Sequence, residues 1–157
     1  MSRGTTSPRS TLHFLRRHAL GCLVLTLLFI SVGYAQEKPR FYVIAHPGVA
    51  SNALPTRFVA DAFLKKVTRF EGGGVIHPVD LPTTSKTRAI FSDQVLKRSV
   101  AAVRSYWQQR IFSGRDVPPP EVDSESQVVK YVAGQPGALG YVSDSTELRG
   151  VKLIALQ

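Results

Sequence analysis

The sequence predicts an α/β fold, a single layered domain with a mostly parallel sheet and flanking helices. Short apolar runs typical of buried strands alternate with segments whose apolar residues recur at helical spacing. This alternation is the pattern of layered α/β domains. The expected strands cover 41–45, 75–79, 138–142 and 151–156. The expected helices carry the apolar stripes of 58–63, 90–96, 100–111 and 128–132.

The expected core combines residues from both kinds of element. The sheet should contribute Val43, Ile44, Val75, Ile76, Leu139 and Tyr141. The helices should contribute Phe58, Phe63, Phe91, Leu96, Trp107 and Val128. Serines at 99 and 124 stand where helix N-caps are expected, and Gln127 follows the second of them at capping-box spacing.

Residues 1–35 have the pattern of a signal peptide. Four arginines and no acidic residue precede an apolar run that ends at Val32 and is short for a membrane span. Small residues close the segment and predict cleavage after Ala35. The alternative is an uncleaved N-terminal anchor. Cys22 precedes most of the apolar run, so lipid attachment at this cysteine is not expected.

Cleavage would leave 122 of the 157 residues, 36–157, with 16 Lys and Arg against 11 Asp and Glu. The net charge of this part is therefore +5, rather than the +9 of the full sequence. A modest excess suits an anionic ligand or an acidic partner, and equally an ordinary protein surface. The clustered basic and aromatic pattern of a nucleic-acid binder is not evident. The part has no cysteine, hence no disulfide, and must fold on one hydrophobic core.

The stretch 75–98 contains the candidate binding site. An apolar strand pattern ends at Pro82, and a polar loop then opens an amphipathic helix. Free backbone N–H groups and the positive end of the helix dipole coincide at such a place, which can hold an oxyanion. The candidate ligand residues are Thr83, Thr84, Ser85, Lys86 and Arg88. The alternative is that Thr84 or Ser85 only caps the helix, while Arg88 pairs with a surface acid.

No catalytic or metal-binding constellation is supported, so we expect neither an enzyme nor a cofactor nor a metal site. His46 and His77 each follow a strand and precede a proline, without Cys, His or carboxylate at metal-ligand spacing. Asp80 lacks the positioned partner that a general base needs. The glycines at 72–74 precede a strand and lack the Lys-Ser/Thr ending of a phosphate loop.

Several fragments resemble a known family in the same order along the chain. They are AFLKK at 62–66, IHPVD at 76–80, RAIF at 88–91, SYW at 105–107, IFSGR at 111–115 and PGALGYV at 136–142. Together they cover nearly all of 41–157 and resemble the small substrate-binding-protein-like domains associated with phosphate ABC transporters. The resemblance implies a three-layer lobe, like one domain of a type 2 periplasmic binding protein.

In larger members of that superfamily, two lobes close on phosphate, which is held by backbone N–H groups, hydroxyls and an arginine at a helix start. By this resemblance Thr83–Arg88 occupies the corresponding place. The sequence departs from that pattern in two respects. A loop of the glycine-serine-glycine-threonine type is replaced by residues 82–87, and 122 residues amount to about one lobe.

Two functions are compatible with these features. The first is an exported, periplasmic binding module for phosphate or a similar oxyanion, in connection with ABC-type phosphate uptake. The second is an accessory protein that keeps the lobe as a scaffold for docking on an envelope or transporter protein. A single lobe exposes its site to water, which weakens charged contacts and favours the second. The hydroxyl and cation cluster favours the first, which is our leading hypothesis. Neither involves nucleic acid, or a membrane span after cleavage.

Overall fold

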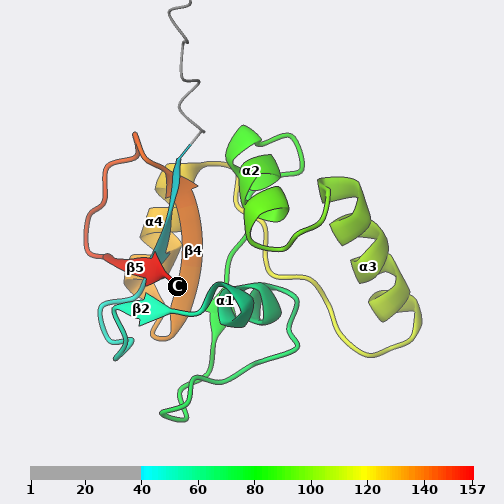
Figure 1. Cartoon of the computed structure of the whole chain (residues 1–157), viewed down its shortest axis with the longest axis horizontal. Helices are drawn as coiled ribbons and strands as arrows, with labels where there is room; N and C mark the ends of the chain where they lie inside the picture. Colours follow the sequence, from blue (N-terminus) through cyan, green and yellow to red (C-terminus); the bar gives the residue numbers. More distant parts are fainter. Residues whose placement is uncertain (1–39) are drawn as a thin grey trace, which may run out of the picture. The chain divides into compact units, whose positions relative to one another are not determined.

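The computed structural model describes residues 40–157 (Figure 1). The predicted signal peptide, 1–35, and its cleavage point lie outside the described residues. The strands are β1 (Phe41–Ala45), β2 (Ala53–Leu54), β3 (His77–Pro78), β4 (Ala138–Ser143) and β5 (Lys152–Leu156). The helices are α1 (Thr56–Phe63), α2 (Lys86–Gln94), α3 (Val100–Phe112) and α4 (Glu125–Gly134). Within this part of the chain, every helix is too short or too polar to cross a membrane.

The five strands form one sheet in the order β2-β5-β1-β4-β3. The central strand, β1, is antiparallel to both of its neighbours, β4 and β5. The outer pairs, β2 with β5 and β3 with β4, are parallel. The α/β class is confirmed, but the sheet is mixed rather than mostly parallel. An apolar run shows that a strand is buried without fixing its direction, so the alternation of elements could not reveal this difference.

Helices pack on both faces of β4, which gives the expected three layers. On one face, a Cβ at Gly140 would lie 2.6 Å from Cγ1 of Val128, so the glycine lets α4 approach the strand closely. On the other face, the ring of Tyr141 stacks on Phe91 of α2, with 3.9 Å between centroids. Phe63 of α1 lies against the same tyrosine, at 5.7 Å. Consecutive residues of one strand therefore anchor opposite layers, as strand geometry requires.

Most of the predicted core residues are buried, and Val75 and Phe58 are the exceptions. Val75 is 42% exposed because it belongs to a small hairpin ahead of β3, where it bridges to Arg69. Phe58 is half-buried, and its ring contacts that of Phe70 at 6.1 Å. The helical period predicted around Phe91 is confirmed, since that side chain is only 1% exposed.

Three helices begin at a serine. The hydroxyls of Ser85, Ser99 and Ser124 each accept the backbone N–H three residues later, at 3.2, 3.2 and 3.3 Å. Gln127 lies at the predicted capping-box position, but its side chain accepts the N–H of Asp123, the residue before the N-cap, at 3.1 Å. These bonds satisfy N–H groups that have no partner inside the helix, and they fix where α2, α3 and α4 start.

Candidate functional site

The loop 79–85 leads from β3 to α2 and contains the predicted site. Its last residue, Ser85, is the N-cap of α2, and its N–H donates to the carbonyl of Pro82 at 2.9 Å. Lys86 and Thr87 are the first residues of α2, so their N–H groups have no acceptor inside the helix. They also lie at the positive end of the helix dipole. The predicted arrangement of strand, loop and helix start is therefore present.

Four of the five predicted ligand residues are at least partly exposed at this helix start. Thr83, Thr84 and Lys86 are exposed, and Ser85 is half-buried. The Ser85 hydroxyl accepts the N–H of Arg88, but a hydroxyl has one proton and two acceptor lone pairs, so it can still donate. Hydroxyl, ammonium and backbone N–H donors are thus all available within one short segment.

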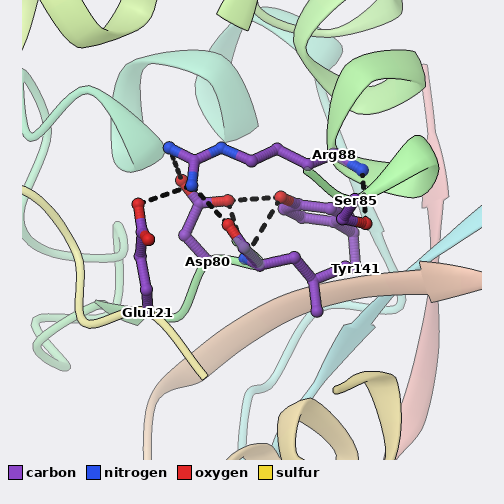
Figure 2. Close-up of polar contacts among 6 residues, drawn as sticks. Asp80, Ser85, Arg88, Glu121 and Tyr141 are labelled. Carbon is purple, nitrogen blue, oxygen red and sulfur yellow. Dashed lines mark hydrogen bonds and ion pairs between the residues drawn. The ribbon is translucent and has the colours of Figure 1, made fainter. Parts of the chain in front are cut away.

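Arg88, the fifth predicted ligand residue, is buried in an ion-pair network. Figure 2 shows its guanidinium at the opposite end of the side chain from Ser85. Nη2 lies 3.1 Å from Oδ2 of Asp80, and Nη1 lies 2.5 Å from Oε1 of Glu121. Nη1 also donates to the carbonyl of Leu81. The Arg88 side chain is 5% exposed. In this arrangement it ties α2 to the loop and is not directed at a solute beside Thr83–Lys86.

The charges in this network offset one another. Burial raises the pKa of Asp80, although Arg88 and the hydroxyl of Tyr141, which donates to Oδ1, favour its charged form. Burial works to lower the pKa of Arg88, but Asp80 and Glu121 outweigh it and raise that pKa. Burial and the Asp80 charge raise the pKa of Tyr141, which stays a neutral donor. With two acids facing one cation, the network offers no surplus positive charge to an anion.

Glu125 is a second polar centre near the loop, and the sequence analysis did not single it out. Its carboxylate accepts from the hydroxyl of Thr87 at 2.6 Å, from the N–H and hydroxyl of Ser143 at 3.0 and 2.6 Å, and from the hydroxyl of Thr146. Burial works to raise the pKa of Glu125, but these hydrogen bonds lower it overall. The only sequence signal was an acid in a first helical turn, which the helix dipole favours.

Other features of the described range do not add to this site. A mostly apolar hollow of about 780 Å³ is lined by parts of 48–55 and 70–75 together with Phe58, His77, Pro136 and Gly137. None of the five predicted ligand residues lines it. His46 accepts the N–H of Gly48 through Nδ1 at 3.0 Å, which fits a strand-end role. Within 40–157, no group of three or more His, Cys, Asp or Glu could hold a metal ion.

Comparison with solved structures identifies the fold. The chain is similar to a putative phosphate ABC transporter substrate-binding protein with bound phosphate from Clostridium perfringens, with a TM-score of 0.60 and 20% identity over 75% of this chain and 45% of that one. It is also similar to PstS from Borrelia burgdorferi, with a TM-score of 0.58 and 11% identity over 76% of this chain and 47% of that one. An ABC-type phosphate transport receptor from Vibrio cholerae gives a TM-score of 0.53 and 15% identity, over 75% of this chain and 46% of that one.

No protein-family model and no curated protein matches the chain. At these identities the likeness concerns the fold alone, which is that of part of these solved proteins. The chain spans less than half the length of these solved proteins. The lobe architecture predicted from the sequence is therefore confirmed.

Proposed function

We propose that this domain is a solute-binding lobe that holds phosphate or a similar small oxyanion at the start of α2, and that it is not an enzyme. The ligand residues are Thr83, Thr84, Ser85 and Lys86. Arg88 does not contact the ligand and instead positions the first turn of α2. In this proposal the protein is exported to the periplasm after loss of 1–35 and works in connection with ABC-type phosphate uptake.

The observation that carries the proposal is the grouping of unused donors at one exposed helix start. The backbone N–H groups of Lys86 and Thr87 lack helical acceptors, and the exposed Thr83 and Thr84 directly precede the N-cap Ser85. Backbone N–H groups at a helix start, together with its dipole, favour an anion. The Lys86 ammonium adds the one full positive charge among these residues. The fold likeness to a protein with bound phosphate gives independent support.

Arg88 has a positioning role in this proposal. Its ion pairs with Asp80 and Glu121 hold the first turn of α2 against the loop. A rigid first turn presents its N–H groups in one orientation, which lowers the ordering cost of binding. The ligand itself meets neutral donors and Lys86. Because a site open to water screens each charged contact, we expect weak affinity.

Calorimetric titration tests this function. The protein is titrated with phosphate, sulfate and a neutral sugar, and saturable heat is expected for the oxyanions only. Lys86→Ala should weaken binding by up to about fivefold, the effect of one exposed charge contact. Thr83→Ala combined with Thr84→Ala should weaken it further. Lys130→Ala removes an exposed lysine from α4 and should change nothing. Equal titrations of the wild type and the loop variants would contradict the proposal.

A second function, docking on a protein partner, is favoured by a charge asymmetry. The segment 97–115 contains five Lys and Arg residues and no acidic residue. The rest of 36–157 therefore contains 11 basic and 11 acidic residues. Positive charge is thus concentrated on α3 and its flanks, where Asp116, 3.8 Å from Arg110, is a neighbouring acid. Ile111 and Phe112, at the end of this helix, are 52% and 92% exposed. An exposed aromatic residue on a basic helix is complementary to an acidic surface of a partner protein.

Site-specific photo-crosslinking in cells tests this second function. A photoreactive residue at position 112 should give a protein adduct. The same residue at position 153, where Leu153 is 49% exposed on β5, should not. Identical adducts from both positions, or none from either, would count against docking through α3.

A further inference from the structure

Four donors from three parts of the fold converge on one carboxylate. Oε1 of Glu125 accepts from the hydroxyl of Thr87, in the first turn of α2. Oε2 accepts from the N–H and the hydroxyl of Ser143, at the end of β4, and from the hydroxyl of Thr146 in the following turn. Thr87 is buried. These donors are neutral, and together they satisfy both oxygens of the carboxylate.

This donor set is suited to any small oxyanion. Two oxygens on one central atom, as in acetate, phosphate or sulfate, present the same acceptor pair as the Glu125 side chain. Three of the donors are hydroxyls, whose protons rotate to suit the acceptor. Bonds from neutral donors to an ionised acceptor are among the stronger hydrogen bonds in proteins.

We infer that Thr87, Ser143 and Thr146 form an oxyanion-binding cradle that the chain fills with its own Glu125 carboxylate. A free oxyanion competes with Glu125 for this cradle. Glu125 is the first residue of α4 and is only half-buried, so its side chain can leave the cradle without unwinding the helix. Since these donor side chains are distinct from those of Thr83–Lys86, the inference goes beyond the proposed function.

The internal carboxylate acts as a competitor at high effective concentration. A group tethered nearby by a short link acts as if present at about millimolar concentration. Free oxyanions therefore bind this cradle weakly in the wild type, and removal of the Glu125 side chain exposes the donors. Loss of the carboxylate also leaves the Thr87 hydroxyl and the Ser143 N–H in need of an acceptor, which a free anion can supply.

The test is rescue of a Glu125→Ala variant by free anions. We expect Glu125→Ala to melt at a lower temperature than the wild type. Adding acetate or inorganic phosphate should raise its melting temperature saturably, by at least about 5 °C at concentrations 100-fold above Kd. Glu71→Ala removes an exposed acid from the 70–75 hairpin and should show only the smaller gain of the wild type, which comes from the helix-start loop. Chloride at equal ionic strength controls for screening.

A second substitution locates the bound anion. Thr146→Val, placed in the Glu125→Ala background, should abolish most of the gain that exceeds the wild-type gain, whereas Lys86→Ala in that background should leave this excess intact. Rescue that is insensitive to Thr146→Val, or removed by Lys86→Ala, places the anion at the helix-start loop and overturns the inference. No saturable rescue also overturns it. If Glu125→Ala is unfolded in buffer, recovery of its native circular dichroism with acetate is the readout, with the same outcomes.

Discussion

Replacing Arg88 by alanine should destabilise the protein strongly, because the guanidinium is the one cation in a buried network with Asp80. The two side chains are 5% and 10% exposed, and Nη2 lies 3.1 Å from Oδ2. At an effective dielectric constant of about 20, this separation corresponds to a gross attraction of about 5 kcal/mol. Desolvation offsets much of it in the intact pair, but removing one partner leaves a buried charge uncompensated, which costs about 3–5 kcal/mol. The half-exposed Glu121 adds little.

The expected loss depends on pH. Without Arg88, the folded-state pKa of Asp80, already raised by burial, rises further. The folded protein then binds a proton more readily than the unfolded chain, so stability is lost as pH rises through the folded-state pKa. The difference in the free energy of unfolding between Arg88→Ala and the wild type should therefore be largest at neutral pH. It should become smaller towards pH values of about 4–5.

Urea unfolding at two pH values, followed by circular dichroism, measures this effect. The matched variant combines Asp80→Asn with Arg88→Met, which removes both charges and keeps comparable side-chain volumes. Its free energy of unfolding should be much closer to that of the wild type. A double-mutant cycle made of Asp80→Asn, Arg88→Met and the combined variant then isolates the coupling between the two residues. If Arg88→Ala costs less than about 1 kcal/mol at neutral pH, Arg88 is not held in a buried pair and the inferred positioning role is wrong.

Three further substitutions probe the fold by unfolding measurements. Phe91→Ala should cost about 3–5 kcal/mol, since the ring is buried and stacked on Tyr141; a cost below about 1 kcal/mol would mean that the site is exposed. Gly140→Ala should cost about 1–3 kcal/mol, because its Cβ would lie 2.6 Å from Val128; a neutral result would show that α4 can move away freely. Ser85→Ala should cost about 0.5–2 kcal/mol through loss of the N-cap, and no loss of stability would contradict the cap geometry.

Local sequence patterns were sufficient for the features that depend on neighbouring residues. A cap at Thr84 or Ser85 was one of the two interpretations of the polar residues before the helical stripe, and the structure places the cap at Ser85. The burial of Phe91 follows from the same helical period. Val75 was predicted to lie in a buried strand, but it follows a turn of three glycines and belongs to an exposed hairpin. There it pairs with Arg69 and not with a strand of the sheet, so its apolar side chain is not buried.

Features that join distant segments could not be predicted in this way. Asp80 and Glu121 are 41 positions apart, and only the folded chain brings both to Arg88. A positively charged residue at a helix start looks the same in sequence whether it faces solvent or the interior. The Glu125 cradle likewise depends on β4 ending beside the first turn of α2. The antiparallel placement of β1 is equally a property of chain topology, because a buried strand carries no directional signal.

The central claim is that the start of α2 binds a small oxyanion through Thr83–Lys86. Calorimetric titration of the wild-type protein with inorganic phosphate, beside the Lys86→Ala and Lys130→Ala variants, tests it most directly. We predict saturable heat for the wild type and for Lys130→Ala, and clearly weaker binding for Lys86→Ala. Absence of saturable heat in the wild type, or identical curves for all three proteins, would contradict the claim.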